Sequence, residues 1–217
     1  MTTPVAPEHI PLLSSALLAD VLDGLGYRTS ALPADVRPLA PKWKICGRAA
    51  TLSAVRVAFD PPQPYAIEME CIDNLKAGEV LVATTNGDRG SALWGELLST
   101  ACRARGAVGA VIDGLTRDTT RIVDMDFPVF ATGFSPLDSR GRLDCLFHNQ
   151  PIRIGDCHIR PGDWVFGDVD GVVVVPVELA PQAFQRAQAK AQGENRVRDE
   201  LIRGRSLREV FAEHGIL

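Results

Sequence analysis

The stretch ELLSTACRARGAVGAVIDGLTRD, residues 96–118, begins with a carboxylate and ends with an Arg-Asp pair. Glu96 and Asp118 offer hard oxygen ligands, which suit Mg²⁺ or Mn²⁺ better than Zn²⁺. Arg117 offers a planar guanidinium group that can hold a carboxylate or an enolate oxygen. If the fold brings these side chains together, they could bind an oxo acid and stabilise the negative charge that develops on it.

The spacing by itself leaves two interpretations open. An Arg-Asp pair on a loop is a surface ion pair in most proteins, and a Glu near a helix start commonly stabilises the helix by its interaction with the helix dipole. The choice between one site and unrelated surface charges therefore depends on the elements that position these residues.

The elements around this stretch have matching lengths. Six residues with helical spacing predict a helix over 93–105 that is roughly 19 Å long: Leu93, Trp94, Leu97, Leu98, Ala101 and Cys102. Gly106 permits a tight reversal, and the apolar strand 107–112 then runs back roughly 20 Å. The helix start should therefore lie beside DGLTRD, the loop at the carboxyl end of the strand, where ligand crevices form in α/β layers.

The helix start adds a place for an anion. The free backbone N–H groups around Leu97 and Leu98, together with the helix dipole, favour a bound carboxylate. Just upstream, the glycines of NGDRG would let the backbone approach a small ligand closely. We therefore predict one pocket that contains Gly95, Glu96, Arg117 and Asp118.

The rest of the chain alternates helical and strand patterns, and we expect one α/β domain over residues 1–217. The sequence predicts an early helix in IPLLSSALLADVLDGLGY, strands at 47–59 and 79–85, a loop at DPPQPY, a short helix near 118–125, a strand at FPVFATG, a β-rich segment at 151–176, and helices over 178–214 with a break at 203–206.

Composition excludes several classes of function. The net charge is −4, the basic residues are scattered and aromatic residues make up 6%, so we expect no nucleic-acid partner. The longest apolar run, GVVVVPV, is too short to span a bilayer, and the N-terminal residues lack the pattern of a signal peptide. Five cysteines without a CxxC motif indicate reduced thiols and a cytoplasmic protein, and four dispersed histidines disfavour a zinc site.

With these residues in view, the sequence resembles the RraA-like superfamily over nearly its whole length. The resemblance is carried by residues 92–133 and by LLADVLDGLG, AGEVLVATTNGD, GDVDGVVVVP and ENRVRDELIRGRSLREVF. Its most specific element is an acidic residue, twenty further residues and then Arg-Asp. The resemblance implies a layered αβ sandwich of the swivelling phosphohistidine-domain type, with a β-rich second half and C-terminal helices, assembled as a homotrimer or hexamer.

The superfamily includes 4-hydroxy-4-methyl-2-oxoglutarate/4-carboxy-4-hydroxy-2-oxoadipate aldolases and a non-enzymatic regulator of ribonuclease E. Resemblance to the aldolases implies a Mg²⁺- or Mn²⁺-dependent lyase that cleaves a 4-hydroxy-2-oxo acid to pyruvate and a second oxo acid. Because decarboxylation of oxaloacetate passes through the same enolate, the same site should perform both reactions. The alternative is a regulator that acts by binding a protein.

The resemblance also implies roles for individual residues. Asp118 would bind the metal, partly through waters, and Arg117 would hold the oxo acid and its enolate. Backbone amides at Leu97 and Leu98, next to Gly95, would bind the substrate carboxylate.

Two further carboxylates would act through water. Glu96 would orient or deprotonate a water, although the aldolases usually carry Asp at this position. Glu194, from the C-terminal helix of a neighbouring subunit, is the best match to a further metal-site carboxylate.

Overall fold

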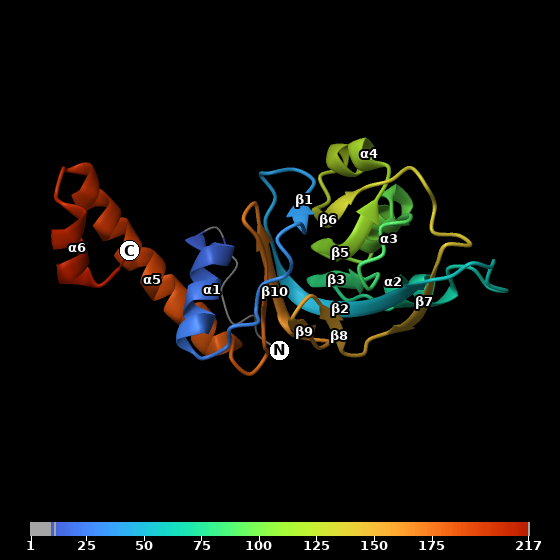
Figure 1. Ribbon diagram of the computed structural model, residues 1–217, viewed down its shortest axis with the longest axis horizontal. Helices are drawn as coiled ribbons and strands as arrows, with labels where there is room; N and C mark the ends of the chain where they lie inside the picture. Colours follow the sequence, from blue (N-terminus) through green and yellow to red (C-terminus); the bar gives the residue numbers. More distant parts are fainter. Residues whose placement is uncertain (1–9, 11, 217) are drawn as a thin grey trace.

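The computed structural model describes residue 10 and residues 12–216. Segment 1–9, in which we expect no signal peptide, lies outside these residues. Figure 1 shows a body built around a β-sheet and a helical arm that projects from one side of it. Across the described residues, every helix is too short or too polar to cross a membrane.

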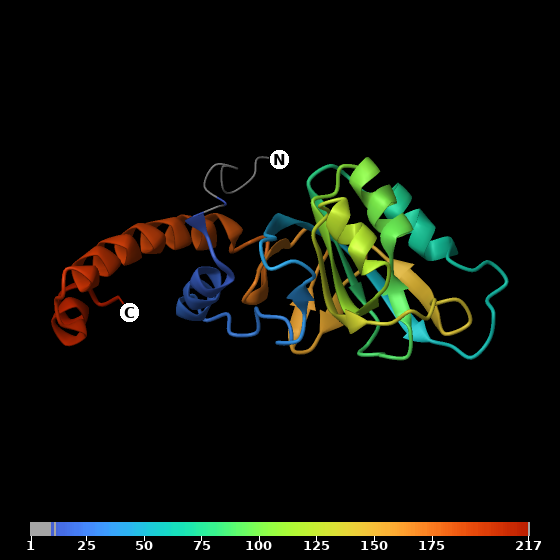
Figure 2. The ribbon, with the colours of Figure 1, turned by 90° about the horizontal axis from the view of Figure 1, so that it is seen from above.

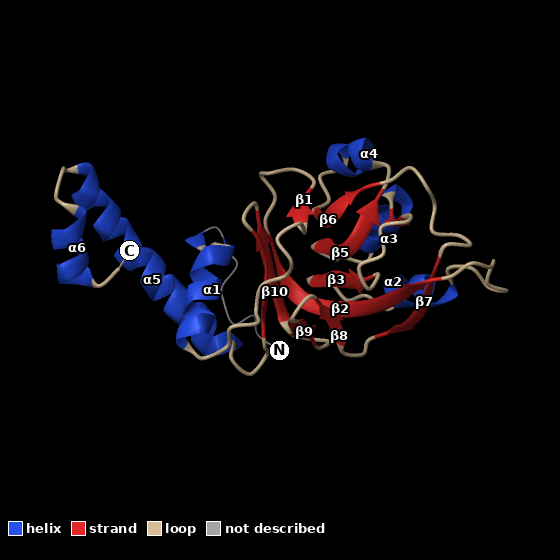
Figure 3. Ribbon diagram, viewed as in Figure 1, coloured by secondary structure: helices blue, strands red, loops and turns tan. Residues whose placement is uncertain are grey.

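The body is organised by one mixed sheet (Figure 3). At its centre, β2 (Ile45–Arg56), β3 (Glu79–Thr84), β5 (Gly109–Thr116) and β6 (Val129–Phe134) pair in parallel. β1 (Arg37–Pro38) pairs antiparallel with β6, while β10 (Trp164–Asp168), β11 (Gly171–Val175) and β7 (Leu143–His148) extend the β2 side with antiparallel pairs. The apolar residues of the central strands are buried, as expected for parallel strands that are covered on both faces.

Helices cover this sheet on one face. α2 (Ala66–Asp73), α3 (Glu96–Ala104) and α4 (Thr119–Asp124) share an apolar cluster with the central strands. A second cluster joins the sheet to the small hairpin of β8 (Ile152–Ile154) and β9 (Cys157–Ile159). This arrangement places the carboxyl end of β5 beside the start of α3, while the loop that leaves α3 lies at the amino ends of β3 and β5.

The C-terminal arm consists of α5 (Ala180–Ile202) and α6 (Leu207–His214). The first part of α5 packs with α1 (Ser15–Gly24) against β10 and β11 in a third apolar cluster. The remainder of α5 extends past the body, and α6 folds back against α5 (Figure 2). The predicted helices over 178–214 and their break at 203–206 are confirmed.

The prediction of a helix that begins at residue 93 is wrong. Residues Ala92–Trp94 form a short strand, β4, that pairs in parallel with the end of β5, and the helix begins at Glu96. Trp94 is 1% exposed, so its side chain packs in the core beside the sheet rather than on a helical stripe. For the same reason β5 continues to Thr116, through residues that the sequence predicted as loop.

One helix, α2, was not predicted from the sequence. α2 follows the proline-rich loop and contains three acidic residues, so its apolar spacing is weak. Its N-cap residue, Tyr65, has a φ of 66°, in the left-handed region that few bulky residues adopt. This strained entry turns α2 so that its first residues border the site described next.

Candidate active site

A cavity of about 320 Å³ lies where β4, β5, α2 and α3 meet. Its walls combine an apolar surface with a few charged groups, as is common for small-molecule sites. It is lined by Tyr65, Glu68, Met69, Ala92, Leu93, Trp94, Gly95, Leu97, Leu98, Arg117, Asp118, Asp138 and Ser139. Five of the residues that the sequence predicted for the site are among them.

Gly95 allows the two halves of this site to approach each other. It joins β4 to α3 in an extended conformation. A Cβ atom at this position would lie 3.0 Å from Asp118 Oδ2 and 3.3 Å from Arg117 Cγ. Contacts this short are uncommon, so a side chain at this position would push the Arg-Asp pair away from the helix start, and glycine lets the two lie directly against each other.

Arg117 is held by a backbone bond and two carboxylates. Its N–H donates to the Trp94 carbonyl at 2.9 Å, which fixes the residue beside β4. Its Nη1 lies 3.3 Å from Asp138 Oδ1, and its Nε lies 3.6 Å from Asp118 Oδ2. The side chain is 37% exposed, so the guanidinium group is oriented by these partners and still open to a ligand.

Asp118 presents its carboxylate to the cavity from a strained backbone. Its φ of 57° is in the left-handed region, which Asp tolerates better than most residues. Asp118 is the N-cap residue of α4, but its side chain makes no capping hydrogen bond. The Oδ2 atom accepts a hydrogen bond from the Glu96 N–H at 3.4 Å. With its side chain 44% exposed, Asp118 retains oxygen atoms that can bind a further partner.

The start of α3 supplies backbone donors. Leu97 and Leu98 line the cavity, and their N–H groups belong to the first helical turn, which has no acceptors within the helix. Leu97 is 75% exposed, so it does not join the core as the predicted apolar stripe required. An anion in the cavity can therefore reach these N–H groups.

Glu96 joins the site by its backbone rather than by its side chain. Its N–H reaches Asp118, but its Oε1 accepts a hydrogen bond from the Thr100 hydroxyl at 2.9 Å, one turn along the same helix. Its carboxylate is not among the groups that line the cavity. The predicted pocket therefore contains Arg117 and Asp118 directly, with Glu96 at its border.

Glu194 lies elsewhere in the same chain. It is on the arm helix α5 and borders a separate groove between α1 and α5. Figure 1 shows that α5 projects from the side of the body opposite to α3. The prediction that Glu194 of a neighbouring subunit completes the site stays a prediction.

Polar groups that the sequence analysis missed form one wall of the cavity. The Tyr65 hydroxyl donates to Asp138 Oδ2 at 2.6 Å. Partial burial opposes ionisation of Asp138, but this hydrogen bond and the Arg117 guanidinium outweigh it and lower the pKa of the carboxyl group. Burial, together with the bond to Asp138, raises the pKa of Tyr65 to about 12. This wall therefore holds an ionised carboxylate and a neutral phenol at neutral pH.

Glu68 also belongs to this wall and is 2% exposed. Its Oε1 is buried and has no hydrogen-bond partner among the described residues. Burial, and secondly the nearby Asp138 carboxylate, raise the pKa of Glu68 to about 8. The sequence does carry a signal, because Glu68 precedes Cys71 and Ile72 by three and four residues and so shares their buried helix face.

The donor set of the cavity fits a hydrated hard cation. Asp118 offers an exposed carboxylate, and Mg²⁺ commonly binds one or two carboxylates while it keeps several waters. Among the described residues, no group of three potential protein ligands converges on this cavity. Asp118 is thus the residue that would hold the cation, with water in the remaining positions.

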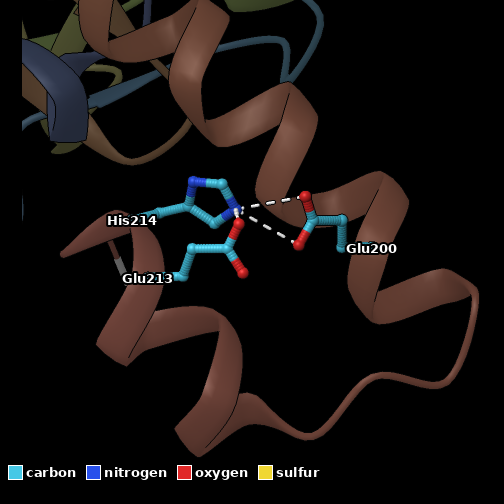
Figure 4. Close-up of side chains that lie close together, drawn as sticks. All are labelled: Glu200, Glu213 and His214. Carbon is cyan, nitrogen blue, oxygen red and sulfur yellow. Dashed lines mark hydrogen bonds and ion pairs between the residues drawn. The ribbon is translucent and has the colours of Figure 1, made fainter.

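A cluster of three potential ligands does occur at the tip of the arm (Figure 4). His214 Nε2 lies 3.1 and 3.2 Å from the two Glu200 oxygens, and Glu213 lies beside them. Arg205 already pairs with Glu200 at 2.6 Å and with Glu213 at 2.9 Å. Since these groups satisfy one another, we interpret the cluster as the ionic contact that joins α6 to α5.

Comparison with known proteins identifies the family. The sequence pattern of the RraA-like family (Aldolase/RraA) matches residues 15–174. The chain is a member of the RraA-like family. A protein of Halalkalibacterium halodurans with the provisional name 4-hydroxy-4-methyl-2-oxoglutarate aldolase is 30% identical over 88% of this chain and 85% of its own length.

Two further proteins are similar to this chain. Legionella pneumophila protein DlpA is 27% identical over 98% of this chain, which spans 34% of that longer protein. The crystal structure of Streptomyces coelicolor RraAS2, described as an unusual member of the RNase ES inhibitor RraA family, superposes with a TM-score of 0.78 at 28% identity, over 93% of this chain and 98% of that one. The predicted fold class is confirmed.

Proposed function

We propose that this RraA-like protein is a divalent-metal-dependent lyase that cleaves a 4-hydroxy-2-oxo acid to pyruvate and a second oxo acid. The observation that supports it best is the meeting of Arg117, Asp118 and the start of α3 in one cavity. The aldolase-type name of the Halalkalibacterium relative supports the same reaction class. Decarboxylation of oxaloacetate would use the same groups, because it produces the same pyruvate enolate.

The start of α3 would hold the carboxylate next to the oxo group. The N–H groups of Leu97 and Leu98 can donate to its oxygens, and the helix dipole favours the negative charge. Gly95 keeps this binding point close to Arg117. A substrate held in this way presents its 2-oxo oxygen to the guanidinium group.

Arg117 would then stabilise the transition state. When the bond between C3 and C4 breaks, its electron pair moves toward the 2-oxo group and the oxygen becomes an enolate. A guanidinium group already fixed by two carboxylates can meet this charge without reorganisation. The C4 hydroxyl loses its proton as the second oxo acid forms, and the enolate carbon takes up a proton to give pyruvate.

Asp118 would hold Mg²⁺ or Mn²⁺, which supplies Lewis-acid polarisation of the oxo group when bound. Glu96 would act through a water, since its side chain is turned toward Thr100. Glu194 of a neighbouring subunit would add a further carboxylate. That last role requires an assembly, and we propose a homotrimer or hexamer in the cytoplasm. The exposed apolar residues of the arm, Ile202, Leu207 and Phe211, support such an assembly.

A second function is a regulator that binds another protein. The Streptomyces relative, which belongs to a family of ribonuclease inhibitors, shares this fold. The cavity itself favours the enzyme, because a protein-binding surface does not require a guanidinium group and a carboxylate converging on a helix start.

The test is release of pyruvate from oxaloacetate and from 4-hydroxy-2-oxoglutarate by chelator-treated protein, with Mg²⁺ or Mn²⁺ titrated back. Pyruvate is measured with lactate dehydrogenase, and the metal-only rate is subtracted. We expect release that depends on both protein and metal. If the protein adds nothing to the metal-only rate with either substrate, the lyase proposal falls and the regulator takes its place.

A further inference from the structure

Glu68 is a buried polar group that the proposed mechanism leaves unused. It lies in the first turn of α2, lines the cavity and is 2% exposed. Its Oε1 has no hydrogen-bond partner among the described residues. An unpartnered polar atom in a protein interior is destabilising, so its retention at the wall of a ligand cavity suggests that a ligand supplies the partner.

The surroundings of Glu68 restrict what that ligand group can be. Asp138, also in the cavity wall, carries an ionised carboxylate, and the Tyr65 hydroxyl already donates to it. The other titratable groups that influence or are influenced by Glu68 are the buried thiols of Cys71, Cys102 and Cys145, on α2, α3 and β7. Arg117, the cation that contacts Asp138, is shared with Asp118, so the wall remains acidic overall and disfavours a second anion.

We propose that Glu68 is a specificity-determining residue whose carboxyl group hydrogen-bonds the hydroxyl of the substrate. This inference rests on the proposed lyase function, because it assumes that the 2-oxo acid end of the substrate occupies the Arg117 side of the cavity. The remaining end then lies against the wall formed by α2 and Asp138.

A hydroxyl fits this wall better than a carboxylate does. A neutral carboxyl group has one donor and one acceptor, as does a hydroxyl, so the two can pair without an uncompensated charge. Burial and the neighbouring Asp138 favour the neutral form of Glu68. A substrate carboxylate would instead be repelled by Asp138 at this position.

The decisive comparison uses two substrates that differ at this position. 4-Hydroxy-2-oxoglutarate carries the hydroxyl, whereas oxaloacetate does not. In Glu68→Leu, which keeps the approximate volume but removes both oxygens, we expect kcat/KM for the hydroxy acid to fall roughly 10- to 100-fold. Oxaloacetate offers no hydroxyl for Glu68 to bind, so its kcat/KM should not fall in parallel with that of the hydroxy acid. Glu68→Gln retains a donor and an acceptor and should recover most of the loss.

A folding defect would lower both activities together, so the ratio of the two kcat/KM values is the readout. Equal losses on both substrates, or no loss in Glu68→Leu, would overturn the inference. The wild-type rates test the lyase proposal separately, because that proposal fails only if neither substrate releases pyruvate.

A binding measurement tests hydroxyl recognition even if neither substrate releases pyruvate. Titration calorimetry on chelator-treated wild type should show tighter binding of 4-hydroxy-2-oxoglutarate than of 2-oxoglutarate. Glu68→Leu should remove the difference. If wild type shows no preference for the hydroxylated ligand, hydroxyl recognition by Glu68 is wrong whatever the outcome of the activity assays.

Discussion

Replacement of Glu68 by Gln should change how stability depends on pH. An acid whose pKa is higher in the folded state than in the unfolded state binds its proton more tightly when the protein is folded. Its contribution to folding stability is therefore complete below the unfolded-state pKa and is lost as the pH rises through the folded-state pKa. For Glu68 these limits are the ordinary value of 4.5 and the folded value of about 8. Between these two values Glu68 is ionised in the unfolded state but still protonated in the folded state. A rise in pH therefore favours the unfolded state and lowers the free energy of unfolding.

The size of the effect follows from these two values. Each pKa unit corresponds to about 1.4 kcal/mol, so the full shift represents at most about 5 kcal/mol. Between pH 5 and pH 7.5 the wild-type free energy of unfolding should fall by about 3 kcal/mol through Glu68 alone. Glu68→Gln cannot ionise, so the stability of wild type relative to this variant should fall by that amount.

Other groups near Glu68 do not produce the same pattern. The pKa values of the Cys71, Cys102 and Cys145 thiols are raised by burial, and that of Asp138 is lowered, so these groups titrate outside the interval. His148, which pairs with Glu70 on the same helix, is present in both proteins and cancels in the difference.

The assay is urea unfolding followed by circular dichroism at pH 5 and pH 7.5, with equal protein concentration and ionic strength. Glu68→Leu is the matched apolar control and should show the same pH trend as Glu68→Gln. A difference between wild type and Glu68→Gln that is the same at both pH values, within about 0.5 kcal/mol, would refute the reasoning.

Four further predictions concern the cavity and the assembly. Arg117→Lys keeps the charge but loses the planar donor pair, so kcat for pyruvate release should fall by roughly 10²–10³; wild-type turnover would show that the assigned role is wrong. Asp118→Asn should raise the Mg²⁺ concentration needed for half-maximal activity, with partial recovery at excess metal, and an unchanged metal titration would contradict its role. Gly95→Ala places a Cβ 3.0 Å from Asp118 Oδ2 and should reduce activity at least tenfold, roughly 1.4 kcal/mol, with a normal circular dichroism spectrum; full activity would mean that close approach is unnecessary. Light scattering should give the mass of a trimer or hexamer, and a monomer mass over a wide concentration range would exclude the assembly.

The meeting of the helix start with the Arg-Asp pair could be predicted from the sequence. The expected helix and strand have similar lengths, and Gly106, with a φ of 82°, provides the tight reversal between them. Those features are local, because they appear in the sequence as apolar periodicity and as a turn-forming glycine. In the structure α3 is shorter and β5 longer than expected, and β4, paired with the end of β5, connects the start of α3 to the Arg-Asp pair. β4 could not be found in this way, because Leu93 and Trp94 fit a helical stripe equally well. Their true state depends on pairing with β5, which is distant in sequence.

The acidic wall has only a weak signal in the sequence: the helical spacing of Glu68 with Cys71 and Ile72 is visible, but its burial is not. Glu68 has the residue type of a surface position, and α2 has too little apolar contrast to mark one face as buried. Asp138 comes from a loop whose place beside Arg117 is set by the fold as a whole. The direction of the Glu96 side chain also depends on a contact, with Thr100, that residue spacing permits but does not require.

Arg117 connects these two parts of the cavity electrostatically. It lies between Asp118 and Asp138, so the three charged groups together carry a net charge of −1 and would resist an anionic substrate. With a divalent cation bound to Asp118, the cation and these three side chains together would carry a net charge of +1. The Arg117 guanidinium would then interact less strongly with Asp118. Substrate affinity and cation affinity should therefore be coupled through Arg117, because each bound charge removes the electrostatic cost of the other.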